Sequence, residues 1–308
     1  MNNMRFVYGP VPSRRLGISL GISPIPKKSC NYSCIYCQLG RTDKMSNKRE
    51  MFFPVEEIML EVNEVLEKDI FFDVITIVGE GEPTLYAGLG ELIFRIKAKT
   101  NKPVAVITNG ALLYDKVLRQ ELSQADIVMP SFDAYEEELW KKINRPVGTI
   151  DFAKVIEGLV TFSQEYQGQL WLEIMFMAGI NDSEKALLKF RQALKKIKYS
   201  RLYLNTTARP PAEAEVKAIS NEQMNRISAF LLGISIELLV SQGFHSEIKD
   251  DYEAINSIIR RHPMNQFEIK SFLKTRNCEN IEGILARLED AENINVIKYR
   301  GFSTYRLK

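Results

Sequence analysis

Three cysteines lie within eight residues near the start of the chain, at Cys30, Cys34 and Cys37. Thiolates at spacings of four and three residues can surround one cubane iron–sulfur cluster from a single tight loop. Such clusters usually have four Cys ligands, so three donors leave one iron without a protein ligand. An open metal position can bind a substrate directly, as it does in other catalytic metal sites. The spacing therefore indicates a 4Fe–4S cluster whose fourth iron binds a substrate.

Two other uses of clustered cysteines stay open on spacing alone. A structural zinc ion would need a fourth ligand, and the remaining candidates, Cys278, His245 and His262, all lie more than 200 residues away in the sequence. A redox pair formed by Cys34 and Cys37 would leave Cys30 without a role. The aromatic residue directly before the last cysteine favours the iron–sulfur interpretation.

The composition is that of an ordinary globular protein, with 45% hydrophobic and 26% charged residues. The 308 residues are enough for one large α/β domain and a small appendage. No apolar run approaches the roughly 20 residues that span a bilayer, and residues 1–15 lack the core of a signal peptide. We therefore expect a cytoplasmic protein without a membrane partner, and in that reducing compartment cysteines rarely form disulfides.

Positive charge is concentrated at the start of the chain. Residues 1–50 contain nine Lys or Arg against two Asp or Glu, although the whole chain has a net charge of only +2. This excess suggests an anionic ligand, with a solvated surface as an equal alternative. Within it, Arg14 and Arg15 could hold a phosphate or a carboxylate of a substrate, or could form ordinary ion pairs.

Residues 18–240 alternate between apolar strand patterns and amphipathic helix patterns. The predicted strands are 18–23, 74–78, 104–108, 127–131, 170–177 and 202–205. The predicted helices are 54–66, 89–99, 114–123, 135–143, 151–166, 182–197 and 220–232, with Asp182 and Ser220 as N-caps of the last two. Strands separated by helices imply parallel pairing. Six such units fit either an open doubly wound sheet or a partial barrel, and both folds bind ligands at the loops after their strands.

The last part of the chain has a different pattern. Helices are predicted at 252–261, 268–273 and 280–289, and strands at 296–299 and 302–307. Three short helices and a hairpin predict a winged-helix-like domain. We therefore divide the chain into residues 1–245, a larger domain with an N-terminal extension, and residues 246–308. Cys278, near the start of the third helix, is predicted to be a structural thiol.

The cysteine motif resembles the signature of the radical S-adenosylmethionine superfamily, CxxxCx(aromatic)C, with Tyr36 as the aromatic residue. Residues 80–83, Glu-Gly-Glu-Pro, are similar to the GGEP motif of that family, with Glu80 in place of the first glycine. The likeness covers roughly residues 7–240. It implies a partial (β/α)6 barrel, a 4Fe–4S cluster held by the three cysteines, and S-adenosylmethionine as the ligand of the open iron.

The resemblance also implies roles for residues in the loops. Glu82 would accept a hydrogen bond from the ammonium group of S-adenosylmethionine, Arg145 would face its carboxylate, and Tyr36 would lie near its adenine and shield the cluster. The other positions implied as contacts of S-adenosylmethionine are Gly81, Pro83, Thr108, Asn109, Ser131, Asp133 and Asn181.

A closer likeness is to the wyosine-synthase-like branch, whose members include tRNA-modifying enzymes. It rests on residues 8–17, 37–42 and 205–211, which contain Arg14, Arg15, Asn205 and Arg209 as candidate substrate contacts. The tRNA-modifying members carry further cysteines for a second cluster. Here Cys278 is the only spare cysteine, so a second cluster within this chain is not expected.

The implied reaction is reductive cleavage of S-adenosylmethionine to methionine and a 5′-deoxyadenosyl radical, which takes a hydrogen atom from a substrate. An electron donor such as flavodoxin or ferredoxin would reduce the cluster. The branch likeness, the basic segment and the C-terminal domain favour RNA, above all tRNA, as the substrate. A peptide or protein recognised by the C-terminal domain is the alternative, and a non-catalytic Fe–S sensor that binds DNA is a third. The atom attacked, the fate of S-adenosylmethionine and the oligomeric state stay open.

Overall fold

The computed structural model describes residues 4–308 except 69, 239–242, 245, 247 and 261. Its centre is a curved eight-stranded sheet in the order β1-β2-β5-β6-β7-β8-β9-β10. The strands are β1 Val7–Ser13, β2 Gly17–Ile22, β5 Val74–Ile77, β6 Val104–Thr108, β7 Ile127–Pro130, β8 Gln169–Phe176, β9 Arg201–Thr206 and β10 Ile234–Ser235. All neighbours pair in parallel except β1 and β2, which form an antiparallel hairpin.

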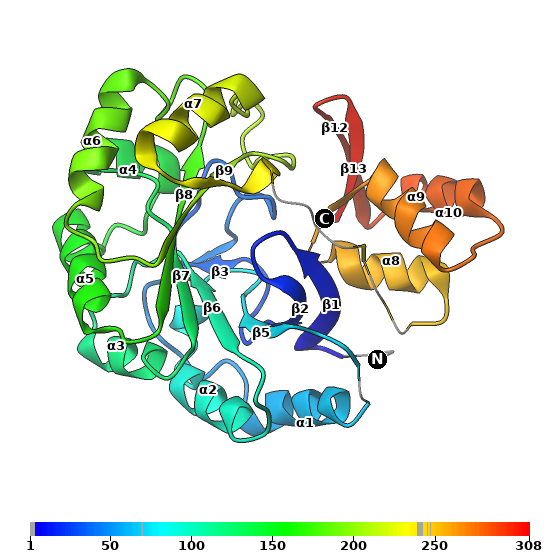
Figure 1. Ribbon diagram of the computed structural model, residues 1–308. Coiled ribbons are helices and arrows are strands. Elements are labelled where there is room, and N and C mark those ends of the chain that lie inside the picture. Colours follow the sequence, from blue (N-terminus) through cyan, green and yellow to red (C-terminus); the bar gives the residue numbers. More distant parts are fainter. Residues whose placement is uncertain (1–3, 69, 239–242, 245, 247, 261) are drawn as a thin grey trace.

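Helices cover the outside of the sheet (Figure 1). They are α1 Val55–Leu66, α2 Leu89–Lys97, α3 Lys116–Leu122, α4 Glu137–Asn144, α5 Phe152–Glu165, α6 Glu184–Leu194 and α7 Asn221–Leu231. Seven successive parallel strands, β2 to β10, with helical crossovers form the partial barrel, and the first six of them are those that the sequence resemblance implies. The edges of its sheet are β1 and β10.

Side chains of each strand divide between the two faces of the sheet, as the period of two requires. In β8, Leu172, Ile174 and Phe176 belong to the large core between sheet and helices. The alternate residues Trp171 and Glu173 face the inside of the barrel, where Trp171 packs in a smaller cluster with Tyr203 and residues of the other strands. The inside is therefore lined by apolar side chains with a few polar ones among them.

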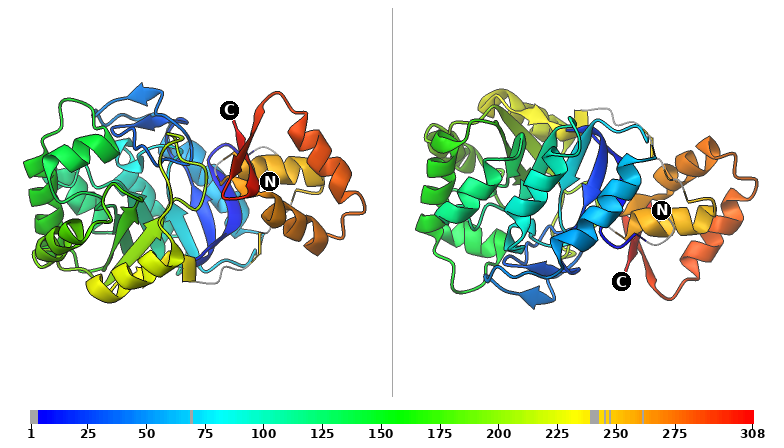
Figure 2. Two further views of the ribbon diagram at one scale, coloured as in Figure 1. Left: turned by 90° about the horizontal axis from the view of Figure 1, so that it is seen from above. Right: turned by 90° about the horizontal axis from the view of Figure 1, so that it is seen from below.

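The C-terminal part of the chain forms a module with its own core, built from residues 248–305. Its elements are α8 Asp251–Ile259, β11 Met264–Asn265, α9 Gln266–Thr275, α10 Ile281–Glu289, β12 Ile294–Tyr299 and β13 Phe302–Leu307. The three strands pair in the order β11-β13-β12, and every pairing is antiparallel. Helix α8 packs against β1, and the views of Figure 2 agree that the module lies on that side of the barrel.

The predicted strands and helices agree with the structure to within a few residues, but one N-cap was placed wrongly, the two edge strands were missed, and so were the two-residue strands β3 Ser29–Cys30, β4 Lys44–Met45 and β11. The N-cap of α6 is Ser183, whose hydroxyl accepts from the amide of Ala186, so the prediction of Asp182 was wrong. Asp182 instead accepts hydrogen bonds from Gly179 and Gln223. Strands β1 and β10 were not predicted. The N-cap Ser220 is confirmed. Among the described residues, no helix is long and apolar enough to cross a membrane.

Helix α5 approaches the loop after β6 so closely that only glycine fits at position 158. A Cβ atom there would overlap the backbone of Leu113 and Tyr114. Alanine favours a helix by about 1 kcal/mol over glycine, but overpacking against a backbone costs about 1–3 kcal/mol. We expect Gly158→Ala to lower the free energy of unfolding measured by urea denaturation. Gly148→Ala, where a Cβ atom meets nothing within 4 Å, is the control and should be neutral. Equal effects of the two would contradict this packing.

Candidate functional site

The cysteine loop follows β2 and is held by short-range backbone bonds. Ser29 and Cys30 form the short strand β3, which pairs with β4, Lys44–Met45. The amide of Cys37 donates to the carbonyl of Cys34 at 3.1 Å. The three cysteines are free thiols of intermediate exposure. This brings the predicted cluster ligands into one loop at the C-terminal end of a barrel strand, where α/β barrels bind their ligands.

Amide groups from distant elements point at the cysteine sulfurs. The side chain of Asn109, after β6, donates to Cys30 Sγ at 3.7 Å, and that of Asn144, at the end of α4, donates to Cys34 Sγ at 3.4 Å. The backbone amide of Tyr32 also donates to Cys30 Sγ, at 3.4 Å. Such N–H···S contacts orient thiolate ligands and tune an iron–sulfur cluster.

The surroundings of the three thiols disfavour free thiolates, so ionised sulfurs here would need to be bound to a metal cluster. Burial raises the pKa of all three, that of Cys30 to about 12. A thiolate in this apolar pocket therefore needs the positive charge of bound iron. In the described part of the chain, no three His, Cys, Asp or Glu side chains form a group that could hold one metal ion. Cubane ligands bind different irons, so this finding weighs against the zinc alternative only.

Glu82 is a buried anchor rather than an exposed acceptor. Its side chain accepts from the amide and hydroxyl of Thr84 at 3.0 and 2.6 Å, from the hydroxyl of Thr108 at 2.6 Å and from the amide of Asn109 at 2.7 Å. Burial raises the pKa of this carboxyl, against the effect of the hydrogen bonds that it accepts. Oε1 accepts three of these bonds and Oε2 accepts one, and the residue is 2% exposed. The contact of the Glu82 carboxylate with the ammonium group of S-adenosylmethionine stays a prediction.

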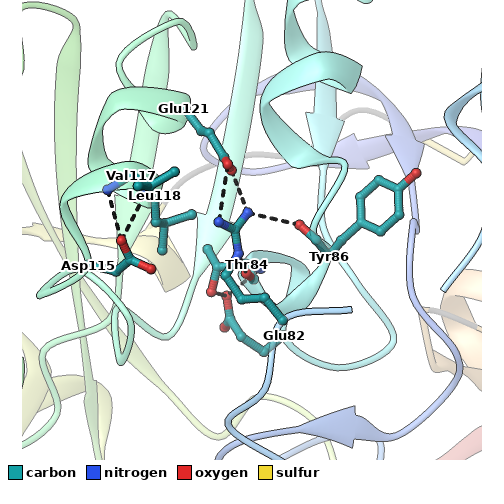
Figure 3. A network of polar contacts seen from close by, with 8 residues as sticks. Glu82, Thr84, Tyr86, Asp115, Val117, Leu118 and Glu121 are labelled. Carbon is teal, nitrogen blue, oxygen red and sulfur yellow. Dashed lines mark hydrogen bonds and ion pairs between the residues drawn. The ribbon is translucent and has the colours of Figure 1, made fainter. Parts of the chain in front are cut away.

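The loop around Glu82 is fixed to the cysteine loop and to α3. The amide of Glu82 donates to Ser29 O at 3.0 Å, and a Cβ atom at Gly81 would overlap this same carbonyl. Pro83 begins a short 3-10 turn, η1 Pro83–Leu85. Figure 3 shows this turn beneath a polar network, in which Arg49 donates to the carbonyls of Thr84 and Tyr86 and pairs with Glu121 of α3. The backbone of residues 80–82 therefore has a fixed shape.

Asp133 joins the loop after β7 to the cysteine loop. Its Oδ2 accepts from the hydroxyl of Tyr36 at 2.5 Å and from Asn144 at 3.0 Å, and its Oδ1 accepts from the amide of Met175 at 2.9 Å. Asn181 is fully buried and donates to the carbonyls of Asp133 and Met175. The structure thus brings these predicted site residues together, but their polar atoms bind the protein itself.

Ser131 lines a cavity beside the cysteine loop. The polar residues of its lining include Asn109, Asp133 and Asn144, and the apolar ones include Trp140 and residues of α5. Trp140 donates to the hydroxyl of Tyr32 at 2.9 Å and so closes α4 onto the cysteine loop. The cavity has a volume of about 20 Å³, far below the roughly 300–1,000 Å³ of small-molecule sites, so it has room for about one water molecule.

Arg145 lies at the C-terminal end of α4 in a left-handed backbone conformation, with φ of 45°. Its guanidinium pairs with Glu213, in the loop after β9. Arg41 binds the same carboxylate through two hydrogen bonds of 2.9 Å. The amide of Glu213 donates to the carbonyl of Ile35 at 3.0 Å. This arginine pair therefore fastens the β9 loop over the cysteine loop, with Arg145 still partly exposed.

The candidate substrate residues fall into two groups. Arg15, in the turn between β1 and β2, forms an ion pair with Glu173 inside the barrel, and Asn205 donates to Glu173 at 3.1 Å. Burial lowers the pKa of Arg15 to about 10. Arg14 donates to the carbonyl of Ile236 at 3.4 Å, beyond β10 at the opposite edge of the sheet. These two arginines therefore reach across the open side of the partial barrel.

Arg209 belongs to the second group, at the boundary with the C-terminal module. Its side chain donates to the carbonyl of Pro263 at 2.6 Å, contacts His262 Nε2 at 3.0 Å and lies 3.5 Å from Glu268. Burial and the neighbouring Arg209 and Arg14 lower the pKa of His262 well below its usual value. Arg209 therefore connects the two parts of the chain through a neutral histidine.

Sequence reasoning missed Asn144, Glu213 and Arg41 as parts of the site. Asn144 directly precedes the predicted Arg145, and Arg41 lies within residues 37–42 of the branch likeness. Position in or beside a motif was the only available signal for these two residues. Glu213 gives no such signal, because it contacts Arg41 from 172 positions away.

Comparison with known proteins agrees with this site geometry. The family model "Radical SAM superfamily" matches residues 25–191, more than half of the chain. The chain belongs to the radical SAM superfamily. Its members use a 4Fe–4S cluster and S-adenosylmethionine, so this radical SAM chain is an enzyme with those two cofactors.

Two relatives and one solved structure place the chain further. It is 35% identical to a UPF0026 protein of Methanocaldococcus jannaschii over 89% of this chain and 88% of the relative. It is 40% identical to a protein named GTPase Obg of Brachyspira hyodysenteriae over 83% of this chain, but spans only 38% of that relative. The crystal structure of a radical SAM methyltransferase from Sphaerobacter thermophilus has a TM-score of 0.51 at 16% identity and covers 71% of this chain and 68% of that one. This likeness shows the fold alone.

The arginine pair on Glu213 predicts a specific pH dependence. Hydrogen bonds from Arg41 and Arg145 lower the pKa of Glu213 from 4.5 to about 2. The ionised form is favoured in the folded state, so its contribution is present above pH 4.5 and is lost as the pH falls towards 2. Glu213→Gln should lower the midpoint of thermal unfolding at pH 7 by a few degrees, and this difference from wild type should shrink between pH 5 and 3. Glu215→Gln, at an exposed neighbouring acid, should show neither effect, and a pH-independent loss in Glu213→Gln would contradict the assignment.

Proposed function

We propose that Cys30, Cys34 and Cys37 hold the 4Fe–4S cluster of this radical SAM enzyme and that the loops beside them bind S-adenosylmethionine. The observation that carries the proposal is the set of N–H···S contacts from Asn109 and Asn144 to two of the three sulfurs. When bound, the cluster supplies the electron for cleavage of S-adenosylmethionine. The work of the chain is to orient the ligand and exclude water and side reactions.

Glu82 Oε2 accepts a single hydrogen bond, from the amide of Asn109. This oxygen and the peptide groups of residues 80–82 are our candidates for the ammonium group of S-adenosylmethionine. Arg145 is placed to receive the carboxylate by exchanging its bond to Glu213, which Arg41 continues to neutralise. Tyr36, Asp133 and Asn181 then act by holding the loops around the cysteines in shape.

Serine substitutions test the ligand set. Replacing any of Cys30, Cys34 or Cys37 should abolish the 4Fe–4S signal in low-temperature EPR and lower 5′-deoxyadenosine formation at least a hundredfold, because each removes one anchor of the cluster. Cys278→Ser is the matched control, since Cys278 packs in the core of the C-terminal module and should leave both readouts unchanged. A Cys30, Cys34 or Cys37 variant that keeps full activity would refute the proposal.

We propose RNA, above all tRNA, as the substrate. Support comes from the exposed cations next to the cysteine loop: Lys44 lies opposite Ser29 in the β3–β4 pair, and Lys48 follows shortly after. Cations beside the site can hold phosphates and orient the strand. We also propose a cytoplasmic setting, because a reducing compartment suits the cluster and its thiols, with flavodoxin or ferredoxin as the electron donor.

A peptide or protein substrate is favoured by one observation on the C-terminal module. Its order of helices and antiparallel strands is that of a winged helix, which we propose for residues 246–308, with residues 1–245 as the barrel domain. Helix α10 carries Glu282 and Glu289 against the single cation Arg287. An acidic helix is poorly suited to phosphates and better suited to a protein partner. If RNA is the substrate, the contacts should therefore come from the barrel.

Paired substitutions separate the two substrates. The double variant Lys44→Gln/Lys48→Gln should bind tRNA at least tenfold more weakly in filter binding, and the slope of its affinity against salt concentration, on logarithmic axes, should become shallower by about one for each phosphate that it no longer binds. The control Lys274→Gln/Lys298→Gln removes the same charge from exposed positions of the module and should bind like wild type. Weaker binding only in the control would assign RNA to the module. No salt-dependent binding by the wild type would favour the peptide substrate.

A further inference from the structure

The last strand of the C-terminal module reaches the loop that follows Cys37. Arg306 of β13 donates from Nη1 to the carbonyl of Gln38 at 3.0 Å. Nearby, Lys27 donates to the carbonyl of Lys308 at 2.7 Å. The module is thus fastened to the cysteine loop itself and not only to the outer surface of the barrel.

The carbonyl that accepts from Arg306 belongs to Gln38, the residue directly after Cys37. A Cβ atom at Gly40, three residues after Cys37, would lie 3.9 Å from both Arg306 Nη2 and Lys28 Nζ. The hydrogen bond to Gln38 therefore holds the charge of Arg306 beside the third cysteine, where it acts on the sulfur through space.

The charges around Arg306 agree with this geometry. Burial lowers the pKa of Arg306, and the charged group that opposes this effect is Cys37. Burial raises the pKa of Cys37, while the Leu39 amide, Arg306 and Lys28 lower it. The half-buried position of Arg306 also limits screening by solvent. Its positive charge therefore stabilises negative charge on the sulfur of Cys37.

We propose that Arg306, held at the carbonyl of Gln38 beside Cys37, raises the reduction potential of the cluster, so that the C-terminal module sets how easily the cluster accepts an electron. A cation near a ligand sulfur stabilises the reduced cluster, which carries one more negative charge. The inference rests on the proposal that Cys37 is a cluster ligand. On this inference the C-terminal module is part of the redox site. The inference holds for an RNA substrate and for a peptide substrate alike.

The test is an EPR-monitored redox titration of the reconstituted full-length protein. We expect Arg306→Gln to bind a full complement of iron but to contain about tenfold less reduced cluster at the midpoint potential of wild type, which corresponds to a midpoint lower by about 59 mV for one electron. Arg306→Lys keeps the charge and should lie between the two. Arg300→Gln is the matched control: it removes the same charge from the same hairpin, where Arg300 pairs with Glu237 at 2.8 Å, and should titrate like wild type.

The outcomes separate the inference from the proposed function. A normal cubane signal with an unchanged potential in Arg306→Gln overturns the inference alone, as does an equal shift in Arg300→Gln. Wild-type protein without a cubane signal overturns the ligand assignment and the inference together. If Arg306→Gln fails to load iron, the comparison of Arg306→Lys with wild type decides: a lower potential supports the inference and an identical one overturns it.

Discussion

A short loop without regular structure must hold three sulfur atoms in place, and this requirement organises the site. Two hydrogen bonds inside residues 30–37 do not suffice to fix such a loop, because each contributes only about 1 kcal/mol. The rest of the support comes from elsewhere in the barrel: Asn109 and Asn144 bind sulfurs, and Asp133 holds Tyr36. The loops after β6 and β7 and the end of α4 therefore have to be in register before the cysteines can take up their positions.

This demand explains why so many polar residues of the site face inward. A buried carboxylate or amide with unfilled hydrogen bonds costs about 1–3 kcal/mol or more, so Glu82, Asp133 and Asn181 are each surrounded by donors or acceptors from neighbouring loops. What they provide is a fixed backbone, and fixed peptide groups are good binding partners because they lose no conformational entropy on binding.

The sequence predicted the elements well where one local signal sufficed. Strand β6 was placed at its observed bounds because Val104–Thr108 is a continuous apolar run, and α1 because its apolar residues recur at helical spacing. Strand β1 was missed because Pro10 and Pro12 argue against a strand. It is an edge strand, where proline is tolerated. The partners of Glu82 and Arg145 within the protein could not be predicted for another reason: they include Thr108 and Glu213, and no local pattern shows contacts between residues so far apart.

The positive charge of residues 1–50 shows how far composition can mislead. Much of it is neutralised by acids from later parts of the chain, in the pairs Arg15–Glu173, Arg41–Glu213 and Arg49–Glu121. These pairs join the N-terminal segment to β8, to the β9 loop and to α3. Much of the charge excess of the segment is therefore used in ion pairs within the protein and is not available to a ligand. Two exposed cations lie beside the cysteine loop: Lys44, and Lys48, which forms an exposed ion pair with Glu50 at 3.3 Å. A charged substrate would therefore be recognised by the place of a few side chains rather than by the net charge of the protein.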